Sequence, residues 1–361
     1  QDYRIYGKAR QAQRDQDKGQ RMSKRASFEI ASQAIEAGSR KTINIPVSTL
    51  SDHTPVTLSA HVIHGGRDGP TMFISAGIHG DEVIGVEIVR RLLRAKNLKS
   101  LRGTLIVVPI VNTFGFLNHS RYLPDRRDLN RCFPGSPNGS LASRLAHIFM
   151  QEIVSRCTLG IDLHSAAIHR MNLPQIRVSA SNKKTMQLAH VFGAPVILTS
   201  ALRDGSLRHE AQKIGVDVLL YEAGEGMRFD EMSVRAGVAG ILRVLKDIEM
   251  LPSAGIAKPK AASIVCSNSN WLRAPAGGLL RMFKSEGDVV AQGDTVCAIS
   301  DPFGDGEVEV ATKYSGIIVG RAVMPIVHEG DALFHIAAVK SAGVAEAAVD
   351  DLATQLEESP L

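Results

Sequence analysis

Between about residue 42 and residue 250, short apolar runs alternate with segments of helical period, and this alternation restricts the fold more than any other feature. Thr71–Gly77 and Leu159–Leu163 are typical of buried strands, whereas Asp81–Lys96 and Asp230–Met250 have the spacing of helices with one apolar face. Strands separated by helices favour a largely parallel sheet with helices on both faces. The active site of such a sheet lies at the carboxyl ends of its strands.

The same patterns predict the remaining elements of this region. We expect further strands at Thr42–Ser48, Val56–His64, Thr104–Ile110, Pro195–Thr199 and Val216–Glu222, and further helices at Leu141–Cys157, Lys183–Phe192 and Ser206–Ile214. Residues 112–139 are rich in Asn, Arg, Pro and Gly, and we predict a long polar loop there.

Composition excludes several classes of protein. The chain is 44% apolar and 22% charged, which are ordinary values for a soluble globular protein and exclude collagen-like, disordered and coiled-coil chains. No apolar run approaches the roughly 18 residues of a membrane span, and no signal-peptide pattern is found. We therefore expect no membrane partner.

The net charge of +5 comes from the first 25 residues, which hold eight basic and three acidic side chains, while the rest of the chain is balanced. This pattern favours a solvated basic leader, with an electrostatic tether as the alternative. The folded part thus has no basic stripe. One Trp and five Tyr also offer few rings for base stacking, so we expect no nucleic-acid partner.

The four cysteines, at positions 132, 157, 266 and 297, form no C-x-x-C pair. In a chain of this length, that usage is more typical of reduced thiols than of a disulfide framework. We therefore expect a cytoplasmic protein.

The pattern changes at residues 251–262, which have the composition of a linker, and short strands with Gly-Asp turns follow. Gly278-Leu-Leu is echoed by Gly316-Ile-Ile, and Glu286-Gly-Asp by Glu329-Gly-Asp. Two similar halves predict a small β-sandwich with pseudo-twofold symmetry. We divide the chain into a basic leader and first segment (1–41), an α/β domain (42–255), an all-β domain (262–340) and a tail that is helical or frayed (341–361).

Two predicted strand ends carry residues that suit a metal ion. His79 and Glu82 lie three residues apart after Thr71–Gly77, and His164 follows the strand Leu159–Leu163. Together they would give the His₂Glu set of a catalytic zinc site, with one open position. Asp162 lies on the same side of its strand as His164 and could accept the second ring proton. Hydrogen-bonded structural histidines are the alternative.

Two further groups could act on a substrate. The polar loop contains closely spaced arginines beside Asn130, at positions 121, 126, 127 and 131, and an arginine fork binds a carboxylate through two hydrogen bonds. Glu222 ends the strand Val216–Glu222, where a carboxylate beside a metal can act as general base. Arg170, in the loop after His164, is a further candidate for substrate contact. A solvated loop and a surface glutamate are the alternatives.

Four motifs stand in one order along the chain: His79-Gly-Asp-Glu82, Asp128-Leu-Asn-Arg131, Asp162-Leu-His164 and Glu222-Ala-Gly224. In order and rough spacing they resemble the succinylglutamate desuccinylase/aspartoacylase family, a branch of the zinc-carboxypeptidase-like fold. The resemblance covers about residues 42–250 and the C-terminal β-domain. It implies a mixed, mostly parallel sheet flanked by helices, plus a small all-β domain that looks like the barrel-sandwich of biotinyl and lipoyl carriers.

The resemblance also implies roles for individual residues. His79, Glu82 and His164 would bind one Zn²⁺ per chain, with Asp162 behind His164, and Glu222 would be the general base that activates the zinc-bound water. Asn130 and Arg131 would hold the substrate carboxylate. Arg121 and Arg126 compete to polarise the scissile carbonyl; we favour Arg121 and assign Arg126 to substrate binding.

The implied activity is zinc-dependent hydrolysis of the amide bond of a small acidic N-acyl amino acid or related metabolite. A metallocarboxypeptidase acting on short peptides is the first alternative. A non-catalytic zinc- or metabolite-binding protein of the same fold is the second. The flanks of Lys313 match neither carrier motif, so we expect the β-domain to narrow the active-site entrance or to mediate assembly as a homo-oligomer.

Overall fold

The computed structural model describes residues 25–259 and 261–358, so most of the predicted basic leader lies outside the described residues. In the first 250 residues, the strands are β1 (Phe28–Ile30), β2 (Gln33–Ile35), β3 (Ser39–Thr49), β4 (Pro55–His64), β5 (Thr71–Ala76), β6 (Thr104–Val108), β7 (Leu159–His164), β8 (Arg170–Val178), β9 (Val196–Thr199) and β10 (Asp217–Glu225). The α-helices are α2 (Ile84–Leu92), α3 (Thr113–Leu117), α4 (Leu141–Glu152), α5 (Lys183–Phe192), α6 (Leu207–Lys213) and α7 (Glu231–Asp247). Short 3₁₀ helices are η1 (Lys96–Ser100), η2 (Leu129–Arg131) and η3 (Val154–Arg156).

The remaining strands follow residue 260. They are β11 (Ile264–Cys266), β12 (Ser269–Arg273), β13 (Gly278–Met282), β14 (Val289–Val290), β15 (Thr295–Ser300), β16 (Glu307–Ala311), β17 (Gly316–Ala322), β18 (Ile326–Val327) and β19 (Ala332–Ala337). The helix α8 (Ala342–Glu358) ends the described chain.

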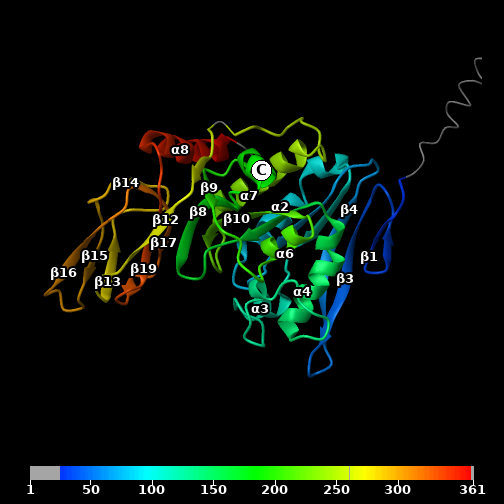
Figure 1. The fold of residues 1–361 in the computed structure, drawn as a ribbon, viewed down its shortest axis with the longest axis horizontal. Helices are drawn as coiled ribbons and strands as arrows, with labels where there is room; N and C mark the ends of the chain where they lie inside the picture. The colour runs from blue at the N-terminus through cyan, green and yellow to red at the C-terminus, as the bar shows by residue number, and fades with distance from the viewer. Residues whose placement is uncertain (1–24, 260, 359–361) are drawn as a thin grey trace, which may run out of the picture.

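One mixed sheet of 13 strands runs through the molecule (Figure 1). Its centre is parallel, in the order β10-β7-β5-β6. Antiparallel strands extend it on both sides, with β4 and β3 beyond β6 and with β8 beyond β10. The predicted fold class, a mixed sheet flanked by helices with an all-β part at the C-terminus, is confirmed.

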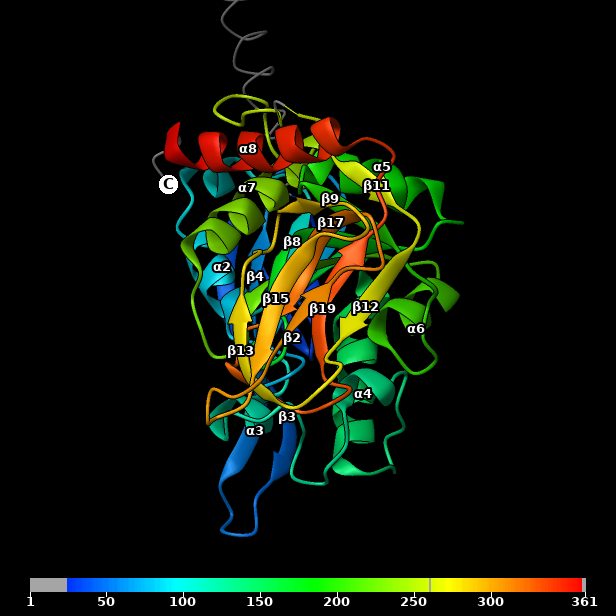
Figure 2. The same cartoon turned by 90° about the vertical axis from the view of Figure 1, so that its left-hand side faces the viewer.

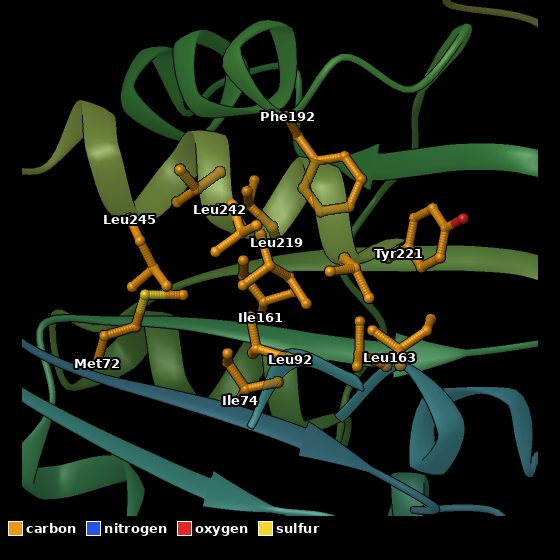
Figure 3. Close-up of a cluster of buried hydrophobic side chains, with 14 of the residues drawn as sticks. Met72, Ile74, Leu92, Ile161, Leu163, Phe192, Leu219, Tyr221, Leu242 and Leu245 are labelled. Carbon is orange, nitrogen blue, oxygen red and sulfur yellow. The ribbon is translucent and has the colours of Figure 1, made fainter. Parts of the chain in front are cut away.

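Two apolar cores cover the two faces of this sheet because strand side chains alternate in direction. In β5, Met72 and Ile74 face the core beneath α2, α5 and α7, whereas Phe73 between them faces the core beneath α4. Figure 3 shows the first core, where Phe192 and Leu245 close over the strands. This packing holds the carboxyl ends of β5, β7 and β10 in fixed positions.

The structure departs from the expected elements in two informative places. The predicted helix Asp81–Lys96 begins only at Ile84, because the preceding residues form the loop that carries the candidate site. Strand β8 was not predicted at all. It contains Pro174 and buries the polar Gln175, whose Nε2 donates to the Val319 carbonyl, so it lacks the apolar alternation of a typical strand.

The C-terminal strands form two facing layers, as the internal repeat predicts. The layer β16-β15-β13-β18 packs against β12, β17 and β19 around a core of its own. Gly278 and Gly316 begin the equivalent strands β13 and β17, and Asp288 and Asp331 accept equivalent turn hydrogen bonds. The second layer also continues the large sheet, since β17 pairs with β8. The proposed domain boundaries themselves stay a prediction.

Helix α8 lies across one end of the C-terminal strands (Figure 2). Its Ala345 and Ala348 pack in one apolar cluster with Ile317 and Val319 of β17. The tail, predicted as helical or frayed, is therefore helical as far as Glu358. In the described residues, no helix has the length and hydropathy needed to cross a membrane.

Candidate active site

His79 and Glu82 lie in the tight loop between β5 and α2. The loop crosses the backbone of α3 so closely that a Cβ on Gly80 would lie 1.9 Å from the Gly115 carbonyl carbon, so only glycine fits there. Both side chains are buried, and the His79 Nδ1 atom lies 2.6 Å from Glu82 Oε1. The β5–α2 loop thus presents an imidazole and a carboxylate together at the sheet edge.

His164 ends β7, the strand beside β5. Its Nδ1 lies 2.8 Å from Glu82 Oε2, and its Nε2 lies 2.7 Å from Asp162 Oδ2. Ser75 donates a 2.7 Å hydrogen bond to the other oxygen of Asp162. The Asp162 carboxylate therefore orients the His164 ring, in the position expected from the two-residue spacing.

The three residues form a donor set that suits a divalent metal ion. One ligand atom from each of His79, Glu82 and His164 lies within 4.8 Å of the others, and all three side chains are buried. Although burial opposes it, the charges of the two imidazoles lower the pKa of Glu82 far below its usual value. Two ring nitrogens and an ionised carboxylate are the ligand types of a three-residue metal site with an open position.

Arg121 is the arginine of the polar loop that reaches this set. Its guanidinium donates to Glu82 at 3.2 Å and to Asp128 at 2.9 Å. Asp128 also lies 3.1 Å from His79 Nε2. Arg126, by contrast, is exposed and does not line the pocket. The geometry therefore separates the two arginines that the sequence left in competition.

Asn130 and Arg131 follow on η2 and line the same pocket. The Asn130 amide oxygen accepts a 2.9 Å hydrogen bond from the Leu207 backbone, which fixes it against the start of α6. The Arg131 guanidinium is exposed and donates to the Asn130 carbonyl. Arg131 is thus available to a ligand at the pocket mouth.

Glu222 lies directly beside His164, because β10 and β7 are in parallel register at these two residues. The strand bulges between Glu222 and Gly224, and a bulge re-aims side chains, often next to a functional site. The Glu222 carboxylate accepts a 2.9 Å hydrogen bond from Asn172 and pairs with Arg177 at 3.0 Å. Asn172 and Arg177 therefore hold the Glu222 carboxylate in the pocket.

These residues share one cavity of about 270 Å³. Its walls also contain residues that the sequence pattern did not single out: Asn172, Arg177, Arg203, Arg208 and Trp271. The first two lie on the unpredicted strand β8. Arg170, named from the sequence, lies over the Trp271 ring at 5.1 Å, and that ring is stacked on His335. Strand β12 thus contributes Trp271 to the lining of the pocket.

The fold and the site together define an α/β protein with a candidate metal centre at the carboxyl edge of its sheet. The succinylglutamate desuccinylase/aspartoacylase catalytic domain matches residues 68–248, which is half of the chain. The chain therefore belongs to the succinylglutamate desuccinylase/aspartoacylase family, as the four motifs predict.

Individual relatives agree with this assignment. The chain is 26% identical over 294 residues to the N-alpha-acetyl-L-2,4-diaminobutyric acid deacetylase of Halomonas elongata, covering 75% of this chain and 83% of that protein. It is 29% identical over 212 residues to the succinylglutamate desuccinylase of Photorhabdus laumondii, covering 50% of this chain and 64% of that one. A succinylglutamate desuccinylase/aspartoacylase structure from Rhodobacter sphaeroides superposes with a TM-score of 0.75 at 25% identity, covering 83% of this chain and 96% of the other.

Proposed function

We propose that this protein is a zinc-dependent deacylase that hydrolyses the amide bond of a small N-acyl amino acid. The observation that carries the proposal is the buried set His79, Glu82 and His164 in one pocket with Arg121 and Glu222. The two curated relatives are named as a deacetylase and a desuccinylase, and both names describe removal of an acyl group from an amine.

His79, Glu82 and His164 would hold the zinc ion. When bound in such a site, zinc polarises an amide carbonyl and lowers the pKa of a water from 15.7 to about 7. The buried position of the three ligands supports this, because desolvation strengthens their attraction for a cation. Asp162 keeps the Nδ1 atom of His164 turned toward Glu82 and the metal position.

The remaining residues would act on the substrate directly. Arg121 would donate to the carbonyl oxygen as negative charge develops there, which is commonly the largest electrostatic contribution to such a reaction. Glu222 would take a proton from the attacking water and deliver it to the leaving nitrogen. Asn130 and Arg131 would hold the carboxylate of the amino acid. The products are a carboxylic acid and a free amine.

A pair of substitutions tests the proposal. We expect one zinc ion per chain in the wild type and loss of that ion in His164→Ala, measured by elemental analysis of protein purified without chelator. We expect Glu222→Gln to keep its zinc but to lose at least about 100-fold in turnover of N-acyl amino acids, because general acid–base catalysis contributes typically 10²–10⁴-fold. Amine release from N-succinyl, N-acetyl and N-formyl amino acids is the readout.

Two exposed positions provide matched controls. His328→Ala and Glu346→Gln make the same chemical changes at surface sites outside the pocket, and both should keep zinc and activity. A wild-type protein that takes up no zinc would overturn the proposed cofactor. Full turnover in Glu222→Gln would remove Glu222 from the mechanism.

A further inference from the structure

The loop that joins β7 to β8 supplies part of the cavity wall. Residues 165–167, which follow the candidate ligand His164, line the cavity, and so does Arg170 at the start of β8. Arg170 also lies over the Trp271 ring at 5.1 Å. Loops are in general more mobile than the elements they connect. The contacts that hold this loop therefore decide where its lining residues lie.

Both backbone groups of His169 are held by neighbouring segments. Its N–H donates a 3.1 Å hydrogen bond to the Glu225 carboxylate at the end of β10. Its carbonyl accepts a 2.9 Å hydrogen bond from the N–H of Val323, which follows β17. His169 has a φ of +67°, an uncommon value for a residue with a side chain, and such conformations persist where the surroundings fix them. His169 is thus the anchored point of the loop.

Glu225 is the side chain that forms this anchor. It is 5% exposed, and its second carboxylate oxygen pairs with the Nε of Arg228 at 3.1 Å. The backbones also approach closely here, since a Cβ on Gly226 would lie 2.8 Å from the backbone nitrogen of Ile168. Burial of a carboxylate is costly unless the group is paired and hydrogen-bonded. An acid at this position is therefore better explained by the contact that it makes than by filling of space.

We propose that Glu225 is a positioning residue, which sets the affinity of the pocket for its substrate by fixing the β7–β8 loop through the N–H of His169. This inference rests on the proposed function. Glu225 is not among the residues that line the cavity, so it acts through the loop and not on the substrate itself. A wall that is already ordered binds a ligand more tightly, because less conformational freedom is lost on binding.

Removal of the hydrogen-bond acceptor tests the proposal. In Glu225→Ala we expect the KM for the best substrate among N-succinyl, N-acetyl and N-formyl amino acids to rise about 10-fold. The kcat should stay within about threefold of the wild type, because the loss concerns binding more than the chemical step. Glu225→Gln keeps an oxygen that accepts from His169 and loses only the charge, so its KM should be that of the wild type.

Glu87→Ala is the matched control. Glu87 is also a buried glutamate with an arginine partner, and it lies on α2 outside the cavity lining. Its loss should lower stability but leave KM unchanged, which separates positioning from general destabilisation. Glu225→Met keeps the side-chain length without an oxygen, and it repeats the test should Glu225→Ala fail to fold. An unchanged KM in either folded variant overturns the proposal, and so does an equal rise of KM in Glu225→Gln.

A fluorescence measurement separates this inference from the proposed function. Trp271 is the single tryptophan of the chain, and it lies beneath Arg170, the residue next to His169. Quenching of the full chain by acrylamide should therefore increase in Glu225→Ala and keep its wild-type value in Glu225→Gln and Glu87→Ala. Increased quenching without hydrolysis of any N-acyl amino acid by the wild type would support the anchored loop and contradict the deacylase. Hydrolysis by the wild type, with equal quenching and equal KM in Glu225→Ala, would support the deacylase and contradict the positioning role.

Discussion

Glu82 joins the two halves of the candidate metal centre. One carboxylate oxygen faces Nδ1 of His79 and the other faces Nδ1 of His164, so a single buried side chain aligns imidazoles from two different strand ends. Arg121 contacts the same carboxylate. The arrangement places the proposed carbonyl-polarising group beside the candidate metal ligands.

Asp162→Asn should weaken zinc binding without removing a ligand. The substitution keeps the size of the side chain that faces Nε2 of His164 but removes its charge, and outer partners of this kind are worth 10–100-fold in metal affinity. Competition with a chromogenic chelator measures the dissociation constant. Asp305→Asn, at an exposed position, should leave the affinity unchanged. Equal affinities in the two variants would show that Asp162 does not tune the metal site.

The candidate site residues that the sequence pattern indicates lie at the ends of strands that the same pattern predicts. His79, Glu82, His164 and Glu222 follow apolar strands, and the carboxyl ends of neighbouring parallel strands meet at one edge of a sheet. Arg177 and Arg208 carried no such signal. They come together only because the polar strand β8 lies beside β10, and that pairing is set by distant parts of the chain.

At the scale of elements, ion pairs stabilise α2, the helix that follows the loop carrying His79 and Glu82. Glu87 of α2 accepts from Arg90 at 2.6 Å and from Arg91 at 2.7 Å, and Arg91 also reaches Glu231 of α7 at 2.7 Å. The Glu87 side chain is 10% exposed. This network ties two neighbouring helices over the first core.

Glu87→Gln should lower the free energy of unfolding in a pH-dependent way. The hydrogen bond from Arg90, with a smaller contribution from Arg91, lowers the pKa of Glu87 from 4.5 to about 2. A depressed folded-state pKa stabilises the protein fully above the unfolded pKa and loses that contribution as the pH falls through the folded one. We expect a deficit of about 1–2 kcal/mol at pH 7, shrinking from pH 4.5 toward pH 2.

Urea unfolding at several pH values measures this deficit. Glu329→Gln provides the control, since Glu329 lies on an exposed turn. A deficit that stays constant down to pH 2 would show that Glu87 stabilises the protein by packing and not by its charge.

Helix and strand order was predictable along most of the α/β region, because apolar periodicity is a local property of the chain. The residues at which helices end were less predictable from the sequence. The predicted helix Leu141–Cys157 ends at Glu152 and continues as the separate 3₁₀ turn η3, and the long polar loop contains the short helix α3. Both differences arise where tertiary contacts decide between local conformations that the sequence pattern does not separate.

At the scale of the whole molecule, the packing of the C-terminal strands that continue the large sheet depends on close backbone approach. Gly316 begins β17, and a Cβ there would lie 2.0 Å from the Ala337 carbonyl oxygen. The same strand pairs with β8, which carries the pocket residue Asn172. Gly316 therefore begins the strand that, at Gly320, pairs with Asn172 of β8.

Gly316→Ala should destabilise the protein by at least about 2 kcal/mol, because the new methyl group would overlap backbone that cannot easily move. Gly330→Ala is the control: Gly330 has a φ of +86° but open space around it, so only the backbone cost of about 1 kcal/mol is expected. Urea unfolding compares the two. An equal loss in both variants would contradict the predicted clash.

Strand β8 pairs with β10 along one edge and with β17 and β9 along the other, and this arrangement has a consequence for ancestry. A module attached through a linker can be gained, lost or exchanged as a cassette. Here, deletion of the C-terminal strands would leave the first residues of β8, Arg170–Asn172, without a partner on that edge, and unpaired edges invite pairing with foreign chains. Lineages that kept the α/β sheet would therefore keep the C-terminal strands with it. Recombination between such lineages would be tolerated more readily at other points of the chain.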